Sequence, residues 1–192
     1  YYKYDTLVNA NNNLIISSGL DSICQSIESM LSKNSSKKSL FLSETSLALG
    51  IKYLPILVND RSEINAKGMF LASRLAGESI NISKTTAAHA YSYYLTYHHN
   101  IPHGIAVAII LEKLIDQLKY VSLEDYKKLN SFFIFSGYDD FTAFLNQFDI
   151  EKYDLSKIEK TLFLSSVNQE RLENYPFKID HTSLVEKLKN AL

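Results

Sequence analysis

Apolar residues recur at helical intervals along most of this chain, and this spacing limits the possible folds more than any other feature of the sequence. From Ser18 onward they lie three, four or seven positions apart, as at Ile23, Ile27, Met30 and Leu31. Such intervals place side chains on one face of an α-helix. The alternation of apolar and polar residues that is typical of a strand does not appear clearly after residue 18. We therefore predict an all-α chain without a parallel nucleotide-binding sheet.

Proline and polar residues divide this pattern into separate helices. Pro55 is expected to end or bend the second helix, and Pro102 stands where a mostly buried helix would start. The segment Ser122-Leu123-Glu124-Asp125 resembles a capping box that opens another helix. By residue range, the predicted helices are 18–31, 40–54, 64–79, 85–96, 105–118, 127–135, 141–148, 156–165 and 182–191.

Two segments carry more specific expectations. The first 17 residues are rich in Asn, and we predict an extended lead-in over 1–17. The helix over 64–79 carries a narrow stripe whose small members allow close contact with another helix. The stripe consists of Ile64, Gly68, Leu71, Leu75 and Ser79.

Composition excludes several classes of partner. The chain has 192 residues with 20 basic and 21 acidic groups, so it lacks the basic surface that nucleic acid or an anionic membrane requires. Its longest apolar run, Ile105–Leu111, is far shorter than the roughly 20 residues that span a bilayer. A single cysteine, Cys24, favours a reducing cytoplasm. Because the sequence opens with Tyr1 instead of Met, we expect it to be part of a longer protein.

Two of the five histidines stand out by their surroundings. His89 lies in a helix of small residues, where a buried imidazole needs a polar partner, and His103 follows Pro102 at the first turn of the next helix. The stretch 97–102 reaches up to roughly 20 Å when extended, enough to bring the two imidazoles together. Converging imidazoles indicate a metal site, although a structural histidine is the more common case. The remaining histidines are expected in a loop (His98 and His99) and at a helix N-terminus (His181).

The start of the first long helix offers further donors. Asp21 could supply a third metal ligand, or it could be an acidic residue that stabilises the helix dipole. Gln25 shares the helix face of Asp21, and its amide oxygen would be a weak, neutral ligand or a plain polar contact.

Longer stretches of the sequence carry a family resemblance. They are Gly19–Ser29, Ala76-Gly77, Ile80–Thr86, His89, Ile101-Pro102-His103-Gly104 and Val167–Leu172. In order and in the fourteen-residue interval from His89 to His103, they resemble the helical half of the iron-containing alcohol dehydrogenase family. The Pro-His-Gly turn is the most specific part of this resemblance.

The resemblance implies a fold, a metal and a cofactor. It implies the C-terminal helical domain of the dehydroquinate synthase-like fold, over residues 18–192, preceded by a Rossmann-like domain that binds NAD(P)H and lies outside this sequence. It also implies a divalent metal, Fe²⁺ or Zn²⁺, held by one Asp and three His. Carried over by position, these ligands fall on Asp21, His89 and His103, while Gln25 replaces the first histidine.

Two departures from the family pattern, Gln25 and Tyr93, together with the sequence of residues 82–86 and 88–93, resemble one branch of the family. Tyr93 stands where many members have a histidine involved in proton movement, and this resembles the phosphonoacetaldehyde reductases. The implied reaction is reduction of phosphonoacetaldehyde to 2-hydroxyethylphosphonate, with Tyr93 in the proton path or as a plain packing residue. Lys84, with Ser83 and Thr85 at a helix N-terminus, is the expected phosphonate-binding group or else an exposed loop residue.

Several alternatives to this reading stay open. The chain could belong to another alcohol or polyol dehydrogenase, to a dehydroquinate synthase-like enzyme, or to a helical interaction module without catalysis. We expect the chain to be inactive in hydride transfer by itself. Its expected partners are a small aldehyde or alcohol, the nucleotide-binding domain and a second copy in a homodimer.

Overall fold

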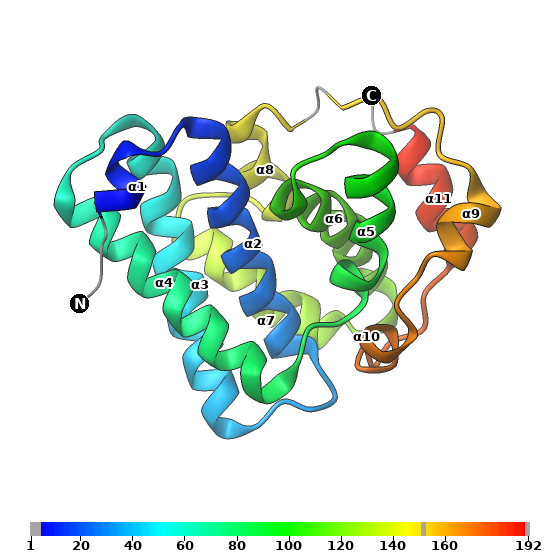
Figure 1. Cartoon of the computed structure of the whole chain (residues 1–192). Helices are drawn as coiled ribbons and strands as arrows, with labels where there is room; N and C mark the ends of the chain where they lie inside the picture. The colour runs from blue at the N-terminus through cyan, green and yellow to red at the C-terminus, as the bar shows by residue number, and fades with distance from the viewer. Residues whose placement is uncertain (1–4, 151–152, 191–192) are drawn as a thin grey trace.

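The computed structural model describes residues 5–150 and 153–190, and within them it contains helices and no strands (Figure 1). The prediction of an all-α chain is confirmed. The helices are α1 (Asp5–Asn9), α2 (Asn12–Leu31), α3 (Lys37–Asn59), α4 (Glu63–Ser83), α5 (Ala87–His99), α6 (His103–Val121), α7 (Leu123–Phe135), α8 (Phe141–Leu145), the 3-10 helix η1 (Asn146–Phe148), α9 (Lys160–Ser165), α10 (Gln169–Glu173) and α11 (His181–Lys189).

Helix α2 is the centre of the molecule. It runs between α3 and α4 on one side and α5 and α6 on the other (Figure 1), and it contacts all four. Its apolar residues Leu20, Ile23 and Ile27 are fully buried. Burial of each such side chain contributes about 1.5–3 kcal/mol to stability, so this helix is fixed firmly in the core.

The predicted extended lead-in is wrong for the residues that the structure describes. Residues 5–9 form α1, and α2 already begins at Asn12. Asn11 is the N-cap of α2, and its side chain accepts a hydrogen bond from the Leu14 amide at 2.9 Å. Asparagine thus starts a helix here instead of interrupting one. Residues 1–4 of the lead-in and Ala191 of the last predicted helix lie outside the described residues.

The stripe predicted for the 64–79 helix is only partly buried. Ile64 is 70% exposed and Leu71 40% exposed, whereas the buried face of α4 consists largely of small residues such as Ala72 and Ala76. Close packing does occur at Gly68, where an added Cβ would lie 2.5 Å from the Tyr53 ring. The helix is therefore rotated so that its small residues, not its large apolar ones, approach α3.

Other helix boundaries are confirmed or shifted. Pro55 lies inside α3, which continues to Asn59, so the helix does not end at the proline. Pro102 is the N-cap of α6, as predicted. Ser122 is the N-cap of α7, but its hydroxyl donates to the Asp125 carboxylate at 2.5 Å, and the predicted capping box does not form.

Helix α3 is long and apolar enough to meet the length and composition criteria of a membrane-spanning helix among the described residues. A core helix meets the same criteria. The buried face of α3, which includes Leu47, Ile51 and Leu54, packs inside the helical core.

The first turn of α6 lies against α2 at a glycine. An added Cβ at Gly104 would lie 1.8 Å from the Ser17 carbonyl oxygen, and the Gly104 amide donates to the Ser17 hydroxyl at 3.2 Å. Only glycine permits this approach. It brings the preceding residue, His103, to the side of α2 that carries Asp21.

We expect Gly104→Ala to destabilise the fold by about 2–3 kcal/mol, because the methyl group must force α2 and α6 apart. In thermal unfolding this corresponds to a midpoint lowered by about 8 °C for a chain of this size. Gly77→Ala is the matched control, since an added Cβ there meets no atom within 4 Å, and it should gain about 0.5–1 kcal/mol. A Gly104→Ala variant that melts like the native chain would disprove the close approach.

Candidate metal centre

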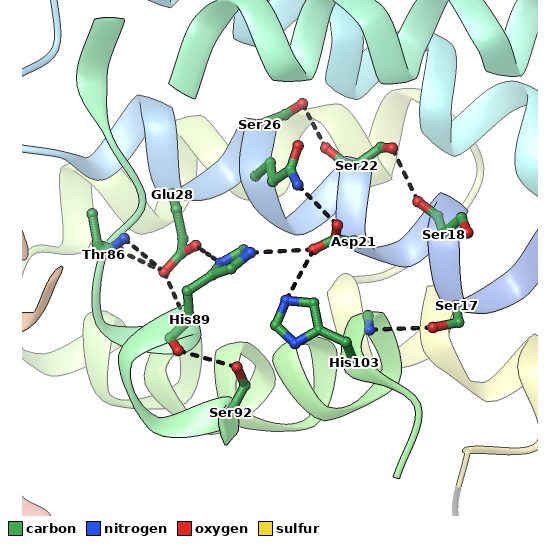
Figure 2. Close-up of polar contacts among 12 residues, drawn as sticks. Ser17, Ser18, Asp21, Ser22, Ser26, Glu28, Thr86, His89, Ser92 and His103 are labelled. Atoms are coloured by element: carbon green, nitrogen blue, oxygen red, sulfur yellow. Dashed lines mark hydrogen bonds and ion pairs between the residues drawn. The ribbon is translucent and has the colours of Figure 1, made fainter. Parts of the chain in front are cut away.

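Three potential ligands converge from three helices. Asp21 on α2, His89 on α5 and His103 on α6 each offer one atom, and these atoms lie within 4.8 Å of one another. His89 Nε2 is 3.2 Å and His103 Nε2 3.9 Å from Asp21 Oδ1 (Figure 2). The two imidazole rings meet edge to face, with centroids 5.4 Å apart. The predicted trio is thus brought together by the fold.

A buried carboxylate behind this trio holds His89 in place. Glu28 is fully buried on α2, and its Oε2 bonds to His89 Nδ1. Its Oε1 accepts hydrogen bonds from the Thr86 amide at 3.1 Å, the Thr86 hydroxyl at 2.8 Å and the His89 amide at 3.2 Å. Because Nδ1 is occupied, Nε2 of His89 points toward Asp21 (Figure 2). This is the arrangement that orients a metal-ligating histidine.

Burial and the neighbouring charges shift the pKa values of His89, Glu28 and His103. Burial alone lowers the pKa of His89, but the charge of Glu28 and hydrogen bonds to Asp21 and Glu28 outweigh it and raise the pKa to about 9. Burial raises the pKa of Glu28, but the charge and hydrogen bonds of His89 more than reverse this effect. The pKa of Glu28 therefore lies below its usual value. Burial lowers the pKa of His103, as do the positive charges of His89 and Arg171.

These shifts predict how the stability of the metal-free chain depends on pH. The folded-state pKa of His89, about 9, lies above the unfolded value of 6.5. Its contribution is therefore fully present below pH 6.5 and is lost as pH rises through 9, by about 3 kcal/mol at most. Urea unfolding at pH 6, 7.5 and 9 measures this decline. His89→Gln should remove it, and a native chain of constant stability over this range would contradict the prediction.

Gln25 lies beside the trio and is oriented toward Asp21. Its amide nitrogen donates to Asp21 Oδ2 at 2.9 Å, while Asp21 Oδ1 faces the two imidazoles. In this arrangement Gln25 fixes the rotation of the Asp21 carboxylate. A role as a fourth ligand through its amide oxygen stays a prediction.

Tyr93 also lies at this site. Its ring stacks on His103 with a centroid distance of 5.9 Å and an interplanar angle of 21°, and it is 39% exposed. The guanidinium of Arg171 lies over the Tyr93 ring, 5.2 Å from the centroid. Tyr93 is therefore close enough to line a substrate, and its predicted place in a proton path is untested.

The predicted phosphonate-binding residues lie elsewhere. Ser83 is fully buried, and its hydroxyl donates to Ser29 Oγ at 2.8 Å. The Lys84 ammonium donates to the Asn81 carbonyl at 3.3 Å, and the Thr85 carbonyl accepts from an amide of Asn174 at 3.2 Å. This segment enters α5 on the side of His89 that faces Glu28, as the position of Thr86 shows (Figure 2). These hydrogen bonds of the three residues thus go to Ser29, Asn81 and Asn174 and not to Asp21, His89 or His103, and the predicted role of the three residues in binding a phosphonate is untested.

The remaining histidines stand apart from the trio. His181 begins α11, as predicted, and its Nε2 lies 3.0 Å from the Tyr91 hydroxyl. His98 and His99 form the last turn of α5, not a loop, and both pack against Tyr94.

Sequence reasoning missed Glu28 and Arg171. Glu28 lies seven residues after Asp21, which places both on one face of α2, and it stands between buried neighbours. That spacing was the signal that could have identified it. Nothing local in the sequence places Arg171 beside Tyr93, because that contact depends on how α10 packs.

Comparison with known proteins decides the family. Residues 15–178 match the model of the Fe-containing alcohol dehydrogenase family, C-terminal. The chain belongs to this family. It is also 31% identical over 146 residues to an aldehyde-alcohol dehydrogenase of Clostridium acetobutylicum, a match that covers 72% of this chain and 17% of the relative.

Two solved structures with about a quarter of their residues identical share the fold. An iron-containing alcohol dehydrogenase of Thermotoga maritima has a TM-score of 0.84 at 26% identity, over 96% of this chain and 51% of that one. Sulfoacetaldehyde reductase of Bifidobacterium kashiwanohense, solved in complex with NAD⁺, has a TM-score of 0.81 at 25% identity, over 98% and 52%. The chain thus spans about half of these solved structures and corresponds to their helical C-terminal domain.

The donor set fits the divalent metal that this family implies. One carboxylate oxygen and two imidazole nitrogens are ligand types that both iron and zinc accept, and three protein ligands leave positions open for substrate. Glu28 leaves Nε2 of His89 available to the ion. Asp21, His89 and His103 are therefore the residues that would hold it.

Proposed function

We propose that this chain is the metal-binding half of an NAD(P)H-linked alcohol dehydrogenase that reduces phosphonoacetaldehyde to 2-hydroxyethylphosphonate. The observation that carries the proposal is the convergence of Asp21, His89 and His103, with His89 held from behind by Glu28. Membership of the iron-containing alcohol dehydrogenase family supports the reaction type. A structural relative that reduces sulfoacetaldehyde supports a short aldehyde with an anionic group.

Each residue of the site has a defined part in this reaction. When bound, the divalent ion acts as a Lewis acid on the carbonyl oxygen. Asp21 and the two imidazoles fix its position, and Gln25 keeps Oδ1 of Asp21 turned toward them. NAD(P)H bound to a nucleotide-binding domain would supply the hydride for the carbonyl carbon, and a proton would complete the alcohol.

Tyr93 is our candidate for delivering that proton. Its ring lies against His103 and is partly exposed, so its hydroxyl can reach a substrate at the same site. If Tyr93→Phe in the assembled enzyme left turnover and its pH profile unchanged, this role would be disproved.

A second candidate is another alcohol dehydrogenase of the same family with an uncharged substrate. The 31% identity to an aldehyde-alcohol dehydrogenase favours it. The two candidates share the metal centre and differ in the charge of the substrate, so binding of a charged alcohol separates them.

A cobalt titration tests the proposed function with this chain alone. We expect Co²⁺ to bind one site, to give the visible absorption bands of a protein-bound ion, and to shift them when 2-hydroxyethylphosphonate is added. His103→Ala should weaken the bands strongly. The proposal would be overturned if the native chain bound no Co²⁺, or if His103→Ala left the absorption bands unchanged. Bands that shift only with uncharged alcohols would favour the second candidate.

A further inference from the structure

A reductase for an anionic aldehyde needs a positive charge near its metal ligands, and the structure offers one that the sequence did not indicate. Arg171, on α10, places its guanidinium carbon 5.2 Å from the centroid of the Tyr93 ring. Tyr93 in turn stacks on His103. Arg171 and His103 thus both lie against the ring of Tyr93, which is partly exposed.

On both sides of Arg171, hydrogen bonds tie α10 to α5 or to the residues just before α5. Before it, the Asn168 amide donates to the carbonyl of Ala90, the residue after His89, at 3.4 Å, and Asn168 Oδ1 caps the Arg171 amide at 3.0 Å. After it, the side-chain amide of Asn174 donates to the Thr85 carbonyl at 3.2 Å. These bonds fix Arg171 relative to the helix that carries His89 and Tyr93.

The charge of Arg171 is not neutralised within residues 5–150 and 153–190. The other two arginines have polar partners: Arg61 donates to the Ala10 carbonyl at 2.7 Å, and Arg74 pairs with Glu78 at 3.2 Å. Arg171 differs, since among the described residues its guanidinium contacts the face of Tyr93 and forms no side-chain hydrogen bond or ion pair. Its donors therefore remain available to a ligand.

We propose that Arg171 binds the anionic group of the substrate, a phosphonate or sulfonate carried on a short aldehyde. The inference rests on the proposed function and deepens it. A guanidinium presents paired N–H donors that match two oxygens of such a group, and contact with the Tyr93 ring restricts its motion. With the carbonyl oxygen at the metal ligands, the anionic group of a short aldehyde lies beside Tyr93, within the range of the arginine side chain.

This assignment replaces Lys84 as the anion-binding residue. The Lys84 ammonium is turned to the Asn81 carbonyl, and its segment lies on the Glu28 side of His89. Arg171 lies on the side of His103 and Tyr93, where the cluster is exposed. Assigning the anion to Lys84 or to Arg171 therefore predicts opposite results when anion binding is measured in variants of these two residues.

Calorimetry on the Zn²⁺-loaded chain tests the inference. The probes are 2-hydroxyethylphosphonate, 2-hydroxyethanesulfonate and the uncharged dimethyl ester of the phosphonate. We expect Arg171→Gln to weaken binding of both anions about tenfold to a hundredfold, the loss typical of hydrogen bonds to a charged group. Binding of Zn²⁺ and of the ester should not change, and Arg171→Lys should keep part of the affinity. Arg74→Gln, which removes the same charge elsewhere, should bind like the native chain.

The outcomes separate this inference from the function on which it rests. If the native chain fails to bind Zn²⁺, the proposed function and the inference both fail. If Zn²⁺ and the anions bind and Arg171→Gln binds the anions as tightly as the native chain, the inference alone is overturned. If Lys84→Gln lost affinity for the anions and Arg171→Gln did not, the inference would also be overturned, and the anion-binding site would lie at the start of α5.

Discussion

Glu28→Ala is expected to destabilise the metal-free chain by about 3–5 kcal/mol at pH 7, as removal of one partner of a buried ion pair does. The substitution leaves the His89 imidazole and the Thr86 amide without their acceptor in the core. For a chain of this size the thermal midpoint should fall by about 10 °C or more. Thermal unfolding followed by circular dichroism measures it.

A matched control separates this effect from the loss of any acidic residue. Glu44→Ala removes a carboxylate that pairs with Lys128 at 2.8 Å, where both side chains are partly exposed, and it should cost about 0–1 kcal/mol. If Glu28→Ala lost no more stability than Glu44→Ala, Glu28 would not be holding His89. Glu28→Gln, which keeps the shape, should fall between the two.

His103→Ala should reduce the affinity for Fe²⁺ or Zn²⁺ on the order of a hundredfold or more while leaving the fold intact. Loss of an outer partner alone costs about tenfold to a hundredfold in metal affinity, so loss of a direct ligand must cost more. The His103 side chain is 40% exposed, and its removal opens little space in the core. Anaerobic calorimetric titration with each metal, alongside thermal unfolding, tests both parts.

His98→Ala and Gln25→His provide the controls for this titration. His98 packs against Tyr94 away from the trio, so its removal should leave metal affinity unchanged. Gln25→His places a third imidazole beside Asp21 and should strengthen binding. If His98→Ala weakened binding as much as His103→Ala, the metal would be bound elsewhere than at the trio.

The convergence of the candidate metal ligands could be predicted from the sequence. The length of the stretch 97–102 allowed His89 and His103 to meet, and the resemblance to the iron-containing alcohol dehydrogenase family placed Asp21 with them. Their distances depend on a contact far apart in the sequence, Gly104 against Ser17, which no local pattern indicates.

The predictions from the sequence differ from the structure where one residue type occurs in two local structures, or where the packing between helices decides which residues are buried. Asn11 starts α2 although asparagine is common in loops. Ile64 and Leu71 have helical spacing but stay exposed, because smaller residues of α4 allow closer packing on α3. Lys84 has the charge that an anion requires, but its ammonium donates to the Asn81 carbonyl, and only the packing of α10 shows that Arg171 lies beside Tyr93.

Asp21, Gln25 and Glu28 occupy successive turns of α2, and this arrangement restricts how the gene can change. One inserted or deleted codon between Asp21 and Glu28 would rotate the rest of the helix by about 100°. Glu28 would then turn away from His89, and the apolar residues of α2 that follow the change would turn out of the core. A point substitution, for example at position 25, keeps this register. Length changes within 21–28 should therefore be absent from functional descendants of this sequence, while substitutions at position 25 should be found.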